Sequence, residues 1–146
     1  MANQRELDEV YINMAHELSK LSKAERKKVG CLIVKDTQII SEGYNGTPKG
    51  FDNDCEYYDY VHEIHTKPEV LHAESNAITK LARSTNSSSG STLYVTLAPC
   101  FECAKLIIQA GIKRVVYLER YRAACSGLAL LDKAQVEVEQ LTRGRV

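Results

Sequence analysis

The chain has 146 residues, of which 44% are hydrophobic and 26% are charged, and 19 basic residues balance 19 acidic ones. This length fits a single domain over residues 1–146, and the composition excludes a chain that is disordered over most of its length. Zero net charge argues against a protein that coats nucleic acid or binds an anionic membrane, since both need a basic excess. A small anionic substrate needs only a few placed donors and is not excluded.

The sequence carries no signal for export or for membrane insertion. No apolar run approaches the roughly 18 residues of a transmembrane helix, and the segment Met1 to Glu9 lacks the basic and apolar regions of a signal peptide. The five cysteines are an odd number, which does not suggest a disulfide framework. We therefore expect a cytoplasmic protein, in which a close pair of cysteines more often binds metal or takes part in chemistry.

The amino-terminal half predicts a helix, a hairpin and a long loop. Residues 4–21 show helical spacing, with an apolar stripe made of Leu7, Val10, Tyr11, Met14, Ala15, Leu18 and Leu21. A polar connector follows at residues 22–28, and β-prone runs at 29–34 and 38–44 predict a hairpin. Residues 45–70 predict an irregular excursion, and a loop of that length in a compact domain is usually functional.

The carboxyl-terminal half alternates strands with helices. Helices are predicted over residues 72–84, 99–110 and 126–133, and strands over residues 92–97, 115–118 and 136–139. Strand–helix–strand units in series imply parallel strands with right-handed crossovers. We therefore predict a three-layer α/β/α fold around a five-stranded mixed sheet whose last strands are parallel. Ligands in such folds collect where helix starts converge, here near residues 72 and 100.

Residues with metal-binding chemistry stand at both of these helix starts. Cys100 and Cys103 are three positions apart, so on a helix their sulfurs lie on one side and can reach one ion. Thiolates form readily at a helix N-terminus, and thiolate with imidazole, here from His72, selects Zn²⁺. Because His72 lies two positions before Glu74, both can face one site only if His72 precedes the regular helix.

Three protein ligands would leave a fourth zinc position for water, which marks a catalytic site. Zinc lowers the pKa of its water from about 15.7 toward 7, and Glu74 could take that proton and pass it to a substrate. This chemistry suits hydrolysis at an amidine-like carbon with loss of ammonia. A structural zinc is the alternative, and its fourth ligand could come from Cys55, His62, His65 or Cys125.

The pattern His72-x-Glu74 followed by Pro99-Cys100-x-x-Cys103 is identified as the signature of zinc-dependent deaminases. From about Val29 to Leu118 the chain resembles the deoxycytidylate (dCMP) deaminases of the cytidine-deaminase-like superfamily. The zinc motifs mark the superfamily alone. The turn Gly43-Tyr44-Asn45-Gly46 and the run Cys-Ala-Lys-Leu-Ile-Ile-Gln-Ala-Gly-Ile-Lys at 103–113 point to the dCMP branch.

The resemblance implies a cytidine-deaminase-like fold and zinc-dependent hydrolysis of dCMP to dUMP and ammonia. It implies that Zn²⁺ is held by His72, Cys100 and Cys103, and that Glu74 is the proton shuttle. Three further residues are implied in substrate binding, namely Asn45 at the sugar, Arg26 at the phosphate and Tyr121 as a cover. Asn45 could instead serve only as a turn residue, and Tyr121 only in packing.

The resemblance also implies a regulated homo-oligomer, since family members are typically hexamers activated by dCTP and inhibited by dTTP with Mg²⁺. The segment implicated in that regulation matches Gly43, Tyr44, Gly46, Lys49 and Gly50. Some relatives bind a second, structural zinc in the long loop, for which the candidates are Cys55, His62 and His65. We expect these three to be ordinary surface histidines and a buried cysteine instead.

Two alternatives to a dCMP deaminase stay open from the sequence. One is a deaminase of free nucleosides, cytosine or tRNA adenosine. The lack of a basic stripe argues against nucleic acid, and nucleosides lack the phosphate that Arg26, Lys27 or Lys49 would meet. The other is a structural zinc domain that binds protein partners. Neither a nucleic-acid nor a membrane partner is expected.

Overall fold

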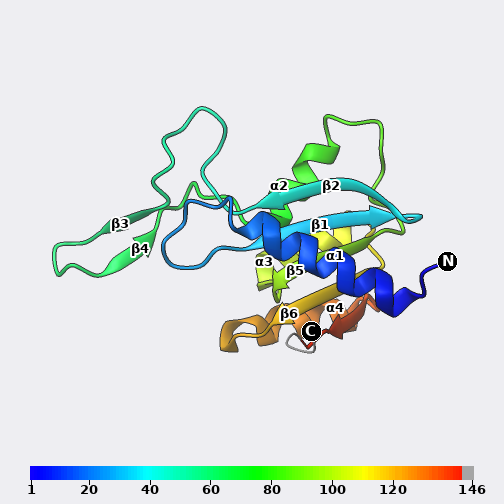
Figure 1. The fold of residues 1–146 in the computed structure, drawn as a ribbon. Coiled ribbons are helices and arrows are strands. Elements are labelled where there is room, and N and C mark those ends of the chain that lie inside the picture. Colours follow the sequence, from blue (N-terminus) through cyan, green and yellow to red (C-terminus); the bar gives the residue numbers. More distant parts are fainter. Residues whose placement is uncertain (143–146) are drawn as a thin grey trace.

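The computed structural model describes residues 1–142 as three layers, with a central sheet between helices (Figure 1). The five-stranded sheet has the order β2-β1-β5-β6-β7. These strands are β1 Gly30–Lys35, β2 Gln38–Tyr44, β5 Thr92–Leu97, β6 Arg114–Glu119 and β7 Glu137–Gln140. β1 pairs antiparallel with β2 and β5, whereas β5, β6 and β7 are parallel. The mixed sheet expected from the sequence is therefore confirmed.

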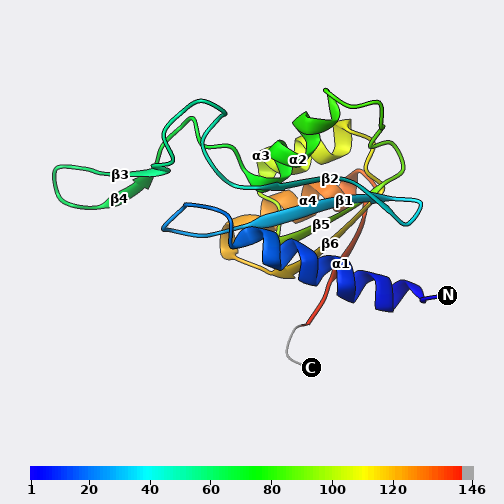
Figure 2. The same cartoon turned by 45° about the horizontal axis from the view of Figure 1, so that its top comes forward.

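The helices divide between the two faces of the sheet, as Figure 2 shows. α1 (Gln4–Ser19) covers one face, and the other is covered by α2 (Ala73–Leu81), α3 (Phe101–Gln109) and α4 (Cys125–Lys133), which follows the short 3₁₀ turn η1 (Arg122–Ala124). Side chains of a strand alternate between faces. In β1, Ile33 joins the core under α2 to α4, whereas Leu32 and Val34 join the core under α1. In residues 1–142 no helix is both long and apolar enough to span a membrane.

Helix α1 packs with a face that overlaps only part of the predicted apolar stripe: Ala15 is buried, and Tyr11 and Leu18 pack against the core. The structure buries Asp8, Ile12, Ala15 and Ser19. It leaves exposed Val10, Met14 and Leu21, for which the predicted stripe is wrong. The helix is turned because the Asp8 carboxylate accepts hydrogen bonds from the Arg114 guanidinium at 2.8 and 2.7 Å and from the Tyr94 hydroxyl at 2.6 Å.

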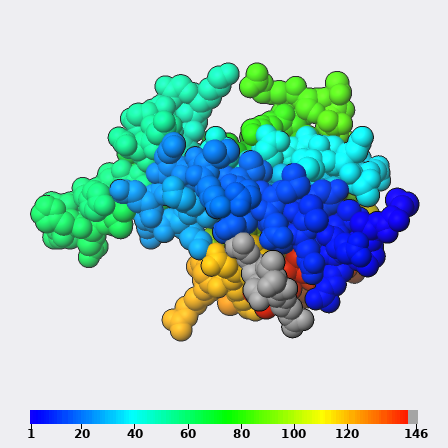
Figure 3. Space-filling view, viewed as in Figure 1, coloured from blue at the N-terminus to red at the C-terminus, as the bar shows by residue number. Residues whose placement is uncertain are grey.

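The excursion at residues 45–70 is more regular than predicted, because it contains a hairpin of β3 (Glu56–Tyr58) and β4 (Ile64–Thr66). Strands of three residues are too short to show an alternating pattern in sequence. This hairpin, here called the arm, projects from the body of the molecule (Figures 1 and 3). Its base is fixed by Glu56, whose carboxylate accepts hydrogen bonds from the backbone N–H groups of Glu25 and Arg26 at 3.0 and 3.1 Å.

Antiparallel pairing brings the start of β1 and the ends of β2 and β5 to one edge of the sheet, where α2 and α3 begin. Two glycines allow close packing there. A Cβ on Gly43 would lie 2.6 Å from the carbonyl oxygen of Ala73, so glycine lets α2 start directly against β2. A Cβ on Gly127 would collide with the carbonyl oxygen of Pro99, so glycine lets α4 pack against the junction of β5 and α3.

Candidate metal centre and active site

Three metal-binding side chains meet at the two helix starts. The Nδ1 atom of His72 lies 3.2 Å from Sγ of Cys103 and 3.5 Å from Sγ of Cys100, and all three donor atoms lie within 4.8 Å of one another. His72 and Cys100 are extended N-cap residues, and Cys103 lies in the first turn of α3. The prediction that His72 precedes its helix is confirmed, and Cys100 does the same. Exposure falls from His72 to the buried Cys103, so the cluster opens on one side.

The two thiols of the cluster differ in charge state, and only Cys100 is already deprotonated. A hydrogen bond donated by the Cys103 thiol, together with the contact to His72, lowers the pKa of Cys100 to about 3, so this sulfur is a thiolate at neutral pH. The same hydrogen bond and burial raise the pKa of Cys103. A metal ion replaces such a shared proton when it binds. One imidazole nitrogen with two sulfurs is a donor set that zinc prefers, and these residues therefore fit a zinc ion.

Glu74 is a buried carboxyl group next to this cluster. Only 4% of the residue is exposed. Burial raises the pKa of its carboxyl to about 7, although the charge of His72 and a hydrogen bond with Cys103 act in the opposite direction. A group whose pKa lies near the working pH exchanges protons most effectively. The site thus places a zinc donor set beside a group suited to proton transfer.

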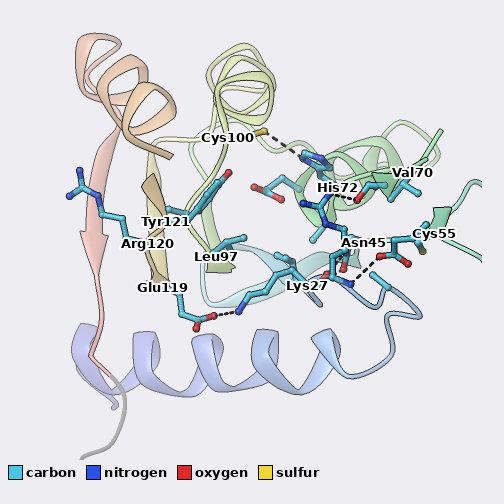
Figure 4. Close-up of a pocket in the computed structure, with 18 residues that line it drawn as sticks. Lys27, Asn45, Cys55, Val70, His72, Leu97, Cys100, Glu119, Arg120 and Tyr121 are labelled. Atoms are coloured by element: carbon cyan, nitrogen blue, oxygen red, sulfur yellow. Dashed lines mark hydrogen bonds and ion pairs between the residues drawn. The ribbon is translucent and has the colours of Figure 1, made fainter. Parts of the chain in front are cut away.

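The cluster faces a cavity of about 530 Å³, a volume typical of small-molecule sites (Figure 4). Asn45, which the resemblance to dCMP deaminases assigns to the substrate, lines this cavity. Its Oδ1 accepts a hydrogen bond from the Val29 N–H at 2.9 Å, and its Nδ2 donates one to the Lys27 carbonyl at 2.8 Å. Asn45 therefore braces the connector, and its amide group retains capacity for a ligand. Its two anticipated functions are compatible.

The other two residues assigned to the substrate also line the cavity. The Nη1 atom of Arg26 donates a hydrogen bond to the hydroxyl of Thr66 in the arm at 3.2 Å. Tyr121 lies directly before η1. Burial raises the pKa of its hydroxyl to about 12, so this side chain is neutral at physiological pH.

The residues assigned to regulation are Gly43, Tyr44, Gly46, Lys49 and Gly50, and none is among the described residues that line the cavity. Gly43 is needed for packing, because a side chain there would collide with the start of α2. Gly46 exchanges two backbone hydrogen bonds with Leu71, of 3.1 and 2.8 Å, immediately before His72. Lys49 and Gly50 lie in an exposed turn. These five residues therefore do not line the cavity, although Asn45 between them does, and Gly46 links the segment to the backbone next to His72.

The candidates for a second metal lie apart. The thiol of the buried Cys55 donates a 3.7 Å hydrogen bond to the Asn53 carbonyl. His65 pairs with Asp59 at 2.7 Å, and His62 has a positive φ of 65° in the turn of the arm. Within the described residues, no potential metal-binding group contains two of these three side chains.

The sequence did not single out several polar residues at the mouth of the cavity, namely Glu56, Thr66, Glu119 and Arg120. Two of them come from the arm, whose strands have no sequence signal. Glu119 and Arg120 did have a sequence signal, because they follow a buried parallel strand, and polar residues at the carboxyl end of such a strand often face a ligand site.

Fold and site together define a zinc hydrolase of the α/β class, and comparison with known proteins places it more closely. The cytidine and deoxycytidylate deaminase zinc-binding region matches residues 5–119. The deoxycytidylate deaminase of Enterobacteria phage T4 is 35% identical over 75% of this chain and 76% of its own length. That of Pongo abelii is 38% identical over 90% and 77% of the respective lengths.

A solved structure agrees with these relatives along almost the whole chain. The dCMP deaminase from the cyanophage S-TIM5, in complex with dCMP and dUMP, is 42% identical over 96% of this chain and 100% of that one, with a TM-score of 0.88. The chain therefore belongs to the cytidine and deoxycytidylate deaminase family. The family membership and the fold predicted from the sequence are both confirmed.

Proposed function

We propose that this chain is a single-domain zinc-dependent deaminase that hydrolyses dCMP to dUMP and ammonia. The observation that carries the proposal is the cluster of His72, Cys100 and Cys103, which faces a nucleotide-sized cavity beside the buried Glu74. The S-TIM5 relative, which holds both dCMP and dUMP, supports the choice of substrate. A purely structural zinc domain would need neither the cavity nor the buried carboxyl group.

The residues around the cavity divide the work of this reaction. When bound, zinc supplies a Lewis acid that makes water a usable nucleophile at neutral pH. Glu74 takes one proton from the attacking water on a carboxylate oxygen and delivers it to the ring nitrogen. It then takes the remaining proton of the hydroxyl group added to the ring carbon and delivers it to the amino group, which leaves as ammonia. Asn45 holds the sugar, Arg26 meets the phosphate and Tyr121 covers the base. Leu97 and Val29 add apolar walls that exclude bulk water.

The substrate is tested by measuring ammonia release from dCMP, deoxycytidine and cytosine in parallel. We expect kcat/KM for dCMP to exceed that for deoxycytidine by roughly 100-fold, the value of two charge-assisted contacts to phosphate. Zinc content is measured on the same preparation. Equal turnover of deoxycytidine would contradict a nucleotide substrate, and a zinc-loaded protein that deaminates none of the three would contradict the proposed reaction.

We also propose that the chain forms a hexamer that dCTP activates and dTTP inhibits, each with Mg²⁺. The hydrogen bonds between Gly46 and Leu71 support this, because a triphosphate bound near Lys49 and Gly50 could displace His72 through them. The rate against dCMP should be sigmoidal without effectors and hyperbolic with dCTP and Mg²⁺, in a preparation whose mass is measured by light scattering. Hyperbolic rates that respond to neither triphosphate would exclude this regulation.

A further inference from the structure

An ion pair joins opposite walls at the mouth of the cavity. The Nζ atom of Lys27, in the connector before β1, lies 2.7 Å from Oε2 of Glu119 at the end of β6, and both residues line the cavity. Figure 4 shows the pair away from His72 and Cys100. The two side chains are 49% and 59% exposed, so solvent and ligand reach both.

The backbones of both partners are fixed, so the pair is a built feature of the mouth. The Lys27 carbonyl accepts the hydrogen bond from Asn45 Nδ2 at 2.8 Å. The Glu119 carbonyl accepts one from the Ala98 N–H at 2.8 Å, directly before the loop that carries Cys100. An exposed ion pair contributes little to stability. A structural purpose therefore explains this pair poorly.

Lys27 differs from the other two cations of the cavity. Arg26 donates to the neutral hydroxyl of Thr66 at 3.2 Å. Arg120 donates to Sγ of Cys125 at 3.4 Å and points away from His72 and Cys100 (Figure 4). In the described part of the chain, Lys27 alone among the three holds an ion pair with a carboxylate through its side chain. That carboxylate occupies the position which an anionic ligand of Lys27 would take.

We propose that Glu119 is an internal counterion of the phosphate site, which the 5′-phosphate of a nucleoside monophosphate displaces from Lys27. The inference rests on the proposed function, and it names Lys27 and Glu119 as residues that make the enzyme prefer a nucleotide to a nucleoside. A phosphate carries a charge of about −1.5 to −2 at neutral pH and three strong acceptor oxygens, so it competes well with one carboxylate for an ammonium group. A nucleoside has no anionic group that could displace Glu119, so the ion pair with Lys27 stays intact when a nucleoside binds.

The test measures the ratio of KM for dCMP to KM for deoxycytidine in Glu119→Gln, in Lys27→Met and in the double variant. A lower ratio means that the phosphate is bound more strongly. Glu119→Gln should lower the ratio of the two KM values by roughly two- to fivefold, the strength of an exposed ion pair. Lys27→Met should raise the ratio by about tenfold, the strength of one hydrogen bond to a charged group. In the Lys27→Met background, Glu119→Gln should leave the ratio as it is, because Glu119 acts through Lys27.

Matched controls are available at an ion pair of similar exposure outside the cavity. Lys80 and Glu42 lie 3.1 Å apart with side chains 50% and 48% exposed, and Lys80→Met and Glu42→Gln should not change the KM ratio. If Glu119→Gln turns over dCMP normally and its KM ratio is unchanged, Glu119 is not a counterion of the phosphate site, and the proposed function is unaffected. A Glu119→Gln effect that persists without Lys27 would show direct repulsion of phosphate and would also overturn it. If the unmodified protein turns over neither compound, the proposed function fails first.

Discussion

Glu74→Gln is expected to reduce kcat for deamination by about 10²- to 10⁴-fold, the usual contribution of a general acid–base group. Glutamine keeps the size of the side chain but cannot accept a proton from water or deliver one to the substrate. Zinc content should not change, because the predicted ligands are His72, Cys100 and Cys103. The measurements are ammonia release under saturating dCMP and zinc by elemental analysis on the same sample.

The control for this variant is Glu102→Gln. Glu102 lies between the two cysteines in sequence, but its side chain is 75% exposed and pairs with Lys105 at 2.7 Å. Like Glu74, it is a glutamate in the first turn of a helix, two positions after an N-cap residue of the metal cluster, but it lacks the burial that raises the pKa of Glu74 to about 7. We expect Glu102→Gln to retain full activity. A Glu74→Gln protein that is active, or one that has lost its zinc, would contradict the proton-shuttle assignment.

The sequence predicts the metal centre well because its ligands belong to short segments at helix starts. His72 lies at the start of α2, and Cys100 and Cys103 lie at the start of α3. Each helix start is recognisable in the sequence, and the ligands meet once the two helices pack side by side on the sheet. The mouth of the cavity is different, since Lys27 and Glu119 are 92 positions apart and meet only when β1, β5 and β6 lie side by side. Tertiary pairs of this kind leave no periodic trace in the chain.

Asp8 shows the same limit for the core. A periodic pattern counts aspartate as polar and places the helix with its apolar residues inward, which would expose Asp8. The structure buries Asp8 beside Ile12 and Ala15, since Arg114 and Tyr94 supply partners from β6 and β5 that the local pattern cannot contain. Strand β6 is easier to predict, because its continuous apolar run is buried on both faces whichever helix covers it.

The buried pair of Asp8 and Arg114 is expected to give the largest change in stability. Asp8 is 1% exposed, and the guanidinium makes two hydrogen bonds with its carboxylate. Arg114→Met would leave a buried carboxylate without its cation, at a cost of about 3–5 kcal/mol in the free energy of unfolding. Urea unfolding at pH 7 measures the difference. The double variant Asp8→Leu/Arg114→Met should recover much of the loss, because it removes the uncompensated charge as well.

The pH dependence separates this account from a simple loss of packing. Burial alone would raise the pKa of Asp8, but hydrogen bonds from Arg114, Tyr94 and Gln4 lower it below 3.8 in the folded protein. Asp8 therefore stabilises the native protein fully above that value, and this stabilisation is lost as the pH falls through the lowered folded pKa. In Arg114→Met the sign reverses, because burial without the guanidinium raises the pKa of Asp8 above its unfolded value. The stability deficit of Arg114→Met should then shrink between pH 7 and pH 5.

Arg5→Met is the control for the loss of a cation near the same helix, since Arg5 pairs with Glu9 at 3.3 Å on the exposed side of α1. Exposed pairs of this kind contribute little, so we expect no measurable change in unfolding at either pH. A deficit in Arg114→Met that is equal at pH 7 and pH 5 would mean that the loss comes from the aliphatic contacts of Arg114 or from its pairs with Glu137 and Glu139, at 3.7 and 3.3 Å, rather than from its charge beside Asp8. In that case Asp8→Leu/Arg114→Met would also show no recovery, and the two measurements would agree on the cause.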